Sequence, residues 1–170
     1  GFTLVKTEFS LILDPDTVPD KNMVDILLEY TKKIKNFSIL APKVKNFNYG
    51  EELYIKHDKN KKYHKMKFIT GCALLFNMKS LYKTGFFDEN IFLYYEEHDL
   101  YYRCLKLGLD IYLIDDANII HHGSSAINKD YDYEIYLNRN WHYCWSKFYY
   151  FKKHYGYFYG IRKTNPNFFR

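Results

Sequence analysis

Two aspartates on either side of a single proline are the residues of this sequence best suited to hold a metal ion. The segment Asp14-Pro15-Asp16 follows an apolar run, residues 9–13, that predicts a buried strand. Because Pro15 favours extended backbone at Asp14, we expect both carboxylates to emerge together in the crevice where α/β sheets bind ligands. Carboxylate oxygens suit Mg²⁺ or Mn²⁺, and such an ion can bridge to a diphosphate. The simpler alternative is an ordinary Asp-Pro turn, followed by a helix that Asp20 caps.

A cluster of acidic residues follows an aromatic run at the start of a predicted helix. Residues 92–100 read F-L-Y-Y-E-E-H-D-L, with Asp88 and Glu89 before them and Arg103 after them. A carboxylate at a helix N-terminus stays ionised, as a general base requires, and the aromatic run would offer a stacking surface for a sugar. The alternative is that these acids only complement the helix dipole.

A pair of histidines ends another predicted strand. His121 and His122 are followed by Gly123 and, two residues later, by Ser125. One imidazole at this position could bind a metal or a phosphate, and the backbone amides after it could lie near an anion. A partly buried histidine that forms hydrogen bonds at a strand end is the commoner alternative.

The elements that must position these residues alternate between strands and helices. Strands are predicted at 9–13, 37–41, 66–76, 110–114 and 118–121, and helices at 20–35, 79–83, 96–107 and 132–154. Pro42 is expected to close one strand, Gly71 to interrupt another, and Gly85 and Gly108 to end helices. Residues 43–65 predict a lysine-rich loop or irregular hairpin. The inner face of the first helix is expected to consist of Met23, Ile26, Leu27, Tyr30 and Ile34. The pattern indicates an α/β fold with a mixed sheet.

Composition limits the number of domains, the classes of partner and the cellular compartment that the sequence allows. The 170 residues suit one domain, and a net charge of +5 suits an anionic small molecule or a membrane surface as well as nucleic acid. Three scattered cysteines, Cys72, Cys104 and Cys144, contain no CxxC pair and indicate a reducing compartment. No stretch is long and apolar enough for a membrane span, the first residues do not resemble a signal peptide, and no Gly-rich phosphate loop occurs.

Taken in order, the motifs resemble family 2 glycosyltransferases of the GT-A fold, most closely the rhamnosyltransferase-like branch. They are D-P-D-T, G-C-A-L-L, G-F-F-D-E, F-L-Y-Y-E-E-H-D-L-x-x-R, G-L-D-I, I-H-H-G-x-S and Arg139-Asn140. The resemblance covers residues 1–155, which would be the catalytic, acceptor-side part of the domain, and it leaves 156–170 as an aromatic, basic tail. It implies a GT-A-like mixed sheet flanked by helices and lacking the N-terminal nucleotide-binding strands. We therefore expect this stretch alone to bind the donor weakly.

The resemblance also implies roles for single residues. Those matching the metal and diphosphate site are Asp14 and Asp16 of the D-x-D motif and His121. Glu97, with Glu96 beside it, matches the catalytic base that deprotonates the acceptor hydroxyl. The positions matching the acceptor side are Gly71, Cys72, Asp99 and Arg103, of which the last two are expected to brace the site rather than react.

The implied reaction is metal-dependent transfer of a sugar, with inversion, from a nucleotide-diphosphate sugar to a glycan or lipid-linked acceptor, with Mg²⁺ or Mn²⁺ as cofactor. Hydrolysis by paired carboxylates is an enzymatic alternative. A non-enzymatic alternative is a basic, aromatic module that binds nucleic acid or a membrane through residues 56–67 and the C-terminal helix. The enzymatic interpretation predicts no nucleic-acid partner and a cytoplasmic protein, with peripheral contact at the inner face of a membrane.

Overall fold

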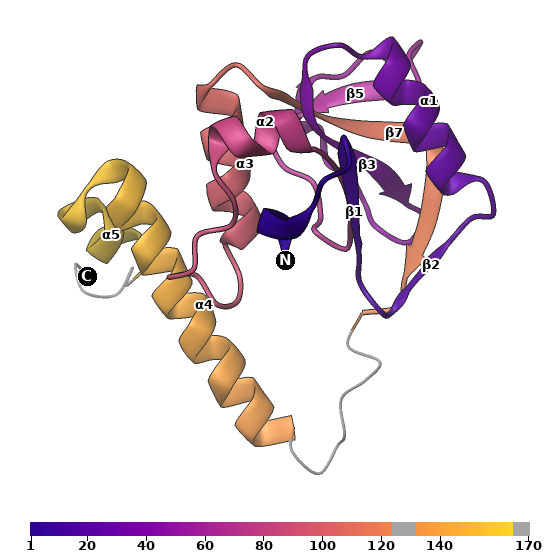
Figure 1. Cartoon of the computed structure of the whole chain (residues 1–170). Coiled ribbons are helices and arrows are strands. Elements are labelled where there is room, and N and C mark those ends of the chain that lie inside the picture. The colour runs from indigo at the N-terminus through magenta and orange to yellow at the C-terminus, as the bar shows by residue number, and fades with distance from the viewer. Residues whose placement is uncertain (124–131, 165–170) are drawn as a thin grey trace. The chain divides into compact units, whose positions relative to one another are not determined.

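The computed structural model describes residues 1–123 and 132–164 (Figure 1). Two compact units make up the chain. The first comprises Gly1–Phe86 and Tyr101–Ala126, and the second comprises Phe87–Leu100 and Ile127–Arg170. The division into residues 1–155 and 156–170 that the family resemblance implies stays a prediction.

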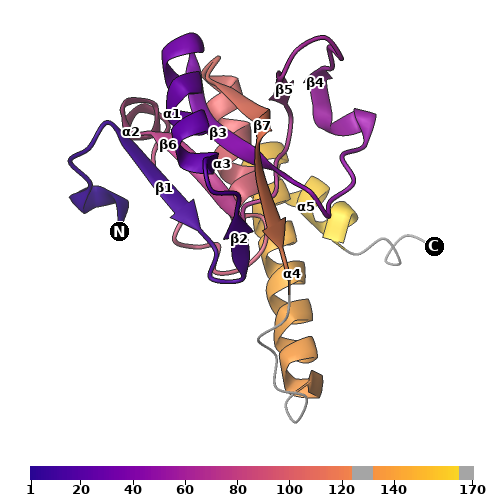
Figure 2. The same ribbon diagram turned by 90° about the vertical axis from the view of Figure 1, so that its right-hand side faces the viewer.

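A seven-stranded mixed sheet forms the first unit. Its strands are β1 (Phe9–Leu13), β2 (Thr17–Pro19), β3 (Phe37–Val44), β4 (Tyr54–Lys56), β5 (Tyr63–Met66), β6 (Ala73–Asn77) and β7 (Asp110–His121). They lie in the order β1-β6-β3-β7-β5-β4, and β2 pairs with the far end of β7 (Figure 2). The pairing of β3 with β7 is parallel, and the others are antiparallel. The predicted α/β class with a mixed sheet is confirmed.

Helices cover the sheet. Helix α1 (Met23–Lys33) packs against β3 and β7, and α2 (Met78–Thr84) packs against β3 and β6, on the other side of the sheet (Figure 1). The predicted inner face of α1 is confirmed, since all of its members are buried or half-buried in one core. That core also contains Leu40, Leu75, Ile114, Ala117 and Ile119 from the strands. Short 3₁₀ turns occur at Phe2–Leu4 and Glu51–Leu53.

Two strand predictions need correction. Strand β3 continues through Pro42 to Val44 instead of closing at Pro42. Proline is tolerated there because β6 pairs with β3 only at Ile39 and Leu40, so beyond that point one side of β3 has no ladder to interrupt. The strands expected at 110–114 and 118–121 are one strand, β7, whose register against β3 shifts between Ile114 and Asn118. The intervening residues form an irregularity rather than a break.

Three further predictions were wrong in detail. The apolar run at 66–76 is divided, with β5 ending at Met66 and β6 beginning at Ala73. Strand β1 was expected to be buried but is a half-buried edge strand of the described sheet. Asp20 does not cap α1: its carboxylate pairs with Lys45 at 2.8 Å, and the helix has no side-chain cap. The irregular hairpin expected within 43–65 is present as β4 and β5.

The second unit contains the start of α3 (Glu96–Lys106) together with α4 (Asp132–Tyr155) and α5 (Tyr157–Thr164). Gly156, at φ 97°, adopts the left-handed backbone that ends α4 and lets the chain turn. Gly160 of α5 then approaches the backbone of α4 closely, because a Cβ there would lie 3.1 Å from the carbonyl oxygen of Phe148 and the amide nitrogen of Lys152. Glycine therefore sets the spacing of this helical hairpin. Among the described residues, no helix combines the length and apolar character that a membrane span requires.

Candidate active site

The Asp-Pro-Asp turn and the end of β7 form one cluster of ligating groups. Asp14, Asp16 and His121 each offer an atom, and these three atoms lie within 4.8 Å of one another. The His121 Nε2 is 3.2 Å from the Asp16 Oδ1. All three residues are half-buried. The structure thus brings together the three residues that the sequence assigned to a metal.

Backbone pairing places this cluster. Strand β2 begins directly after Asp16 and runs antiparallel to the end of β7, with Thr17 opposite His121. The amide of His122 donates to the carbonyl of Asp16 at 3.0 Å. On the other side of the turn, the amide of Asp14 donates to the carbonyl of Cys72 at 2.9 Å. The turn is therefore held to the residues that flank two separate strands, β6 and β7, which fixes both aspartates relative to the histidine.

Asn46 holds the histidine from its other side and was not found from the sequence. Its side-chain oxygen accepts from the amide of His121 at 3.2 Å, and its side-chain nitrogen donates to the carbonyl of the same residue at 2.6 Å. A side chain that satisfies both backbone groups of one residue restricts how that residue can move. Only the tertiary pairing of β3 with β7 shows this role, since an isolated Asn in a polar loop gives no signal.

The electrostatics of the cluster favour a bound cation. Burial, and then the neighbouring Asp16 carboxylate, raise the pKa of Asp14, while His121 partly opposes this. Two carboxylates at such short range repel each other, and a cation between them relieves that repulsion. Two carboxylates and an imidazole also form a donor set that suits Mn²⁺ better than Mg²⁺, since Mg²⁺ strongly prefers oxygen ligands. The residues present fit a divalent metal.

The acidic motif lies in the second unit, at the first turn of α3. Glu96 and Glu97 open the helix, and both are half-buried. Tyr94 and Tyr95 directly before them have φ angles of 65° and 66°. Left-handed backbone is unfavourable for a bulky residue, and such residues persist only where the surroundings hold them, often at functional sites.

Helix α4 supplies these surroundings. Ser146, which is fully buried, donates its hydroxyl to the carbonyl of Leu93 at 2.8 Å. The ring of Tyr95 packs against Tyr143 and Tyr150, at centroid distances of 5.8 and 5.4 Å. The segment that carries the acid pair is therefore clamped to α4.

Asp99 and Arg103 are both engaged in holding neighbouring segments. Asp99 is fully buried, and its Oδ1 lies 2.7 Å from the Nζ of Lys153 and 2.7 Å from the Nε2 of His154. Arg103 donates to three successive carbonyls, those of Thr84, Gly85 and Phe86, at 2.7–3.0 Å. These contacts order the ends of α2 and α4. The predicted place of Asp99 and Arg103 on the acceptor side of the site stays a prediction.

Gly71 and Cys72 are also predicted on the acceptor side, and the Cys72 carbonyl accepts from the amide of Asp14 in the Asp-Pro-Asp turn. The Cys72 side chain is buried, and its carbonyl also accepts from the hydroxyl of Thr17 at 3.4 Å. This segment therefore supports the metal cluster through its backbone. Ser125, predicted to contribute an amide near an anion, lies outside the described residues.

No protein-family model matches the chain, and no curated protein matches it.

Proposed function

We propose that this chain is a metal-dependent glycosyltransferase that moves a sugar from a nucleotide-diphosphate sugar to a glycan or lipid-linked acceptor. The observation that carries the proposal is the cluster of Asp14, Asp16 and His121. Two segments far apart in the sequence, the Asp-Pro-Asp turn and the end of β7, converge on it. Its ligand set suits the divalent ion that nucleotide-diphosphate sugars require.

In this proposal Asp14, Asp16 and His121 would hold Mn²⁺ or Mg²⁺. The bound cation would neutralise the charge that develops on the departing diphosphate. The protein's own contribution is to orient these ligands, through the β2–β7 pairing and the Asn46 contacts. The His121–Asp16 contact at 3.2 Å keeps the imidazole next to the carboxylates when no ion is bound.

Glu97 is proposed as the general base. Its carboxylate would take the proton of the acceptor hydroxyl while the acceptor oxygen bonds to the anomeric carbon and the bond from that carbon to the diphosphate oxygen breaks. The position at the first turn of α3 favours the ionised form that a base needs. Glu96, its neighbour, is the alternative base. The strained tyrosines before the pair would fix the direction in which the carboxylates point.

A transfer assay tests the proposal. The protein is mixed with a panel of nucleotide-sugars and with glycan and lipid-linked acceptors, and both transfer and release of nucleoside diphosphate are measured with Mn²⁺, with Mg²⁺ and with EDTA. We expect turnover that depends on metal, that falls in Asp16→Asn, and that persists in Asp20→Asn. Asp20 is a matched control because it lies close in sequence but pairs with Lys45, outside the cluster. Turnover that neither EDTA nor Asp16→Asn reduces would overturn the metal role.

A further inference from the structure

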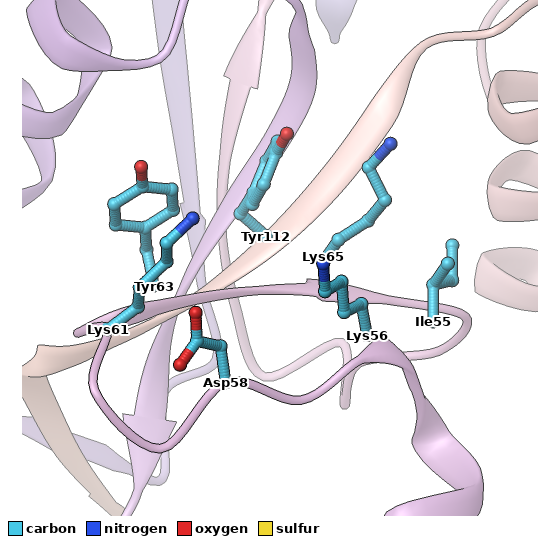
Figure 3. A pocket seen from close by; sticks show the side chains of 7 residues that line it. All are labelled: Ile55, Lys56, Asp58, Lys61, Tyr63, Lys65 and Tyr112. Carbon is cyan, nitrogen blue, oxygen red and sulfur yellow. The ribbon is translucent and has the colours of Figure 1, made fainter.

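A cavity of about 390 Å³ lies in the first unit, over the β4–β5 hairpin and the beginning of β7 (Figure 3). It is lined by Ile55, Lys56, Asp58, Lys61, Tyr63, Lys65 and Tyr112. Tyr112 and His121 are nine residues apart on β7, and the cavity lining shares no residue with the metal cluster. The cavity is therefore a separate feature from the candidate active site.

Strand geometry builds the polar lining. On β5, His64 and Met66 are buried while Tyr63 and Lys65 face the other way, as the alternation of a strand requires. Lys65 is directly opposite Tyr112 in the β5–β7 pair. Figure 3 shows Tyr63, Lys65 and Tyr112 projecting to the same side of the sheet. The rings of Tyr63 and Tyr112 lie 6.0 Å apart, so they form one aromatic wall.

The lining carries an excess of positive charge. Of its three lysines, Lys65 is paired with Asp110 at 2.7 Å. Lys56 and Lys61 have no ion pair with a carboxylate within the part of the chain that the structure describes, and the Lys61 ammonium lies 5.8 Å from the centre of the Tyr63 ring. These two ammonium groups are thus available to an anion. Asp58 is the only acid of the lining among the described residues.

We propose that this cavity binds a phosphorylated sugar. Lys56 and Lys61 would contact the phosphate, the aromatic wall would pack against the sugar ring, and Asp58 would accept hydrogen bonds from sugar hydroxyls. The volume is in the range of small-ligand pockets and suits one hexose phosphate. A nucleic-acid strand is a poorer fit, because it needs an extended cationic track.

Direct binding tests this proposal without any need for transfer activity. Isothermal titration and amide chemical-shift changes are followed with three probes: glucose 6-phosphate, inorganic phosphate and glucose. We expect glucose 6-phosphate to bind most tightly, inorganic phosphate more weakly and glucose weakest, with the shifted amides on β5 and the start of β7. Failure of this assay would leave the proposed transfer reaction untouched, since the cavity is separate from the metal cluster.

Charge-matched variants sharpen the test. Lys56→Gln/Lys61→Gln removes the two lysines proposed to hold the phosphate, and we expect it to weaken glucose 6-phosphate binding by about tenfold or more. Lys59→Gln/Lys62→Gln removes the same charge from the same loop but outside the lining, and should change the affinity by less than about twofold. Equal losses in the two double variants, or no binding of glucose 6-phosphate to the unmodified protein, would overturn the proposal. Tighter binding of oligo(dT) than of glucose 6-phosphate, with equal losses in both variants, would assign the loop to nucleic acid instead.

Discussion

The buried carboxylate of Asp99 lies 2.7 Å from the Nε2 of His154, so that the acid-rich start of α3 is tied to the end of α4 by a direct contact between side chains. Lys153 adds a second contact to the same oxygen, also at 2.7 Å, and a third to Asp88. A buried carboxylate needs such partners because leaving it unpaired away from water is costly.

This arrangement makes Asp99 a stability residue. We expect Asp99→Asn to lower the free energy of unfolding by roughly 3 kcal/mol, because it removes one side of a buried pair and leaves the other side without its counter-charge. Urea unfolding followed by circular dichroism measures the loss. Glu29→Gln, which breaks the exposed pair of Glu29 and Lys33 on α1, is the control and should change stability by less than about 0.5 kcal/mol. A loss of unfolding free energy in Asp99→Asn as small as that in Glu29→Gln would contradict the structural role of Asp99.

Asp88 should make the stability depend on acid pH. Burial opposes its ionisation, but hydrogen bonds from Lys153 and from Asn90 hold the pKa of Asp88 well below its ordinary value. A carboxyl whose pKa is lower in the folded state stabilises the fold above its unfolded pKa of about 4, and this contribution is lost as the pH falls toward the folded pKa. The difference in unfolding free energy between the unmodified protein and Asp88→Asn should therefore shrink as the pH is lowered from 7 to 3. A difference that stays constant with pH would show that the pKa of Asp88 is the same in the folded and unfolded states.

Metal binding can be checked without a donor. We expect Mn²⁺ to bind the unmodified protein weakly, and Asp16→Ala to reduce that affinity by about tenfold or more, because one of three ligands is lost. Electron paramagnetic resonance of free Mn²⁺ gives the affinity. Asn46→Ala should weaken binding to a lesser degree, because it frees His121 without removing a ligand. Equal affinities for Asp16→Ala and the unmodified protein would remove the metal assignment.

The two glutamates of α3 can be separated by conservative substitution. In a protein that shows transfer, we expect Glu97→Gln to lower kcat by roughly a hundredfold or more while donor binding changes little, because an amide keeps the shape but cannot accept a proton. Glu96→Gln should retain most of the activity. The reverse result would identify Glu96 as the base.

The exposed aromatic residues of the second unit predict a surface contact. The aromatic side chains of residues 149–159 form a C-terminal cluster, and several of them are exposed, with Phe158 at 85% and Tyr157 at 55%. Large exposed apolar residues often mark a partner or a membrane. We expect co-sedimentation with anionic vesicles that weakens at high salt and in Phe158→Ser, but not in Phe92→Ser, an exposed aromatic outside the cluster. If the protein does not bind the vesicles, the membrane interpretation is wrong, and a protein partner becomes the explanation for this exposed surface.

The charge variant for that assay follows from the structure. Lys153, which follows Lys152 in α4, pairs with Asp88 and Asp99. Removing it would disturb the fold. Lys152→Gln/Arg162→Gln is the better choice, since Arg162 rests against the ring of Tyr159 and forms no ion pair among the described residues. It should reduce vesicle binding while leaving the unfolding free energy nearly unchanged.

Local sequence signals were sufficient wherever neighbouring residues decide the structure. The apolar spacing in residues 20–35 predicted the buried face of α1. Gly85 and Gly108 marked helix ends because both have a positive φ angle, which glycine adopts without strain. The ligating residues Asp14, Asp16 and His121 were also identified from their types and their positions at strand ends. These features depend on the chemistry of a few adjacent residues, which a sequence contains directly.

Tertiary pairing decided the rest. That His121 meets Asp16, that Asn46 holds His121, and that Lys153 turns toward Asp99 all require segments far apart in the chain to pack together. The pairing of β3 with β7 continues β3 past Pro42 and makes the two predicted strands of β7 one strand, although the local sequence favours a break at both places. The physical reason is that a strand or a buried charge is stabilised by its partner across the sheet or the helix interface, and a single sequence does not contain that partner's position.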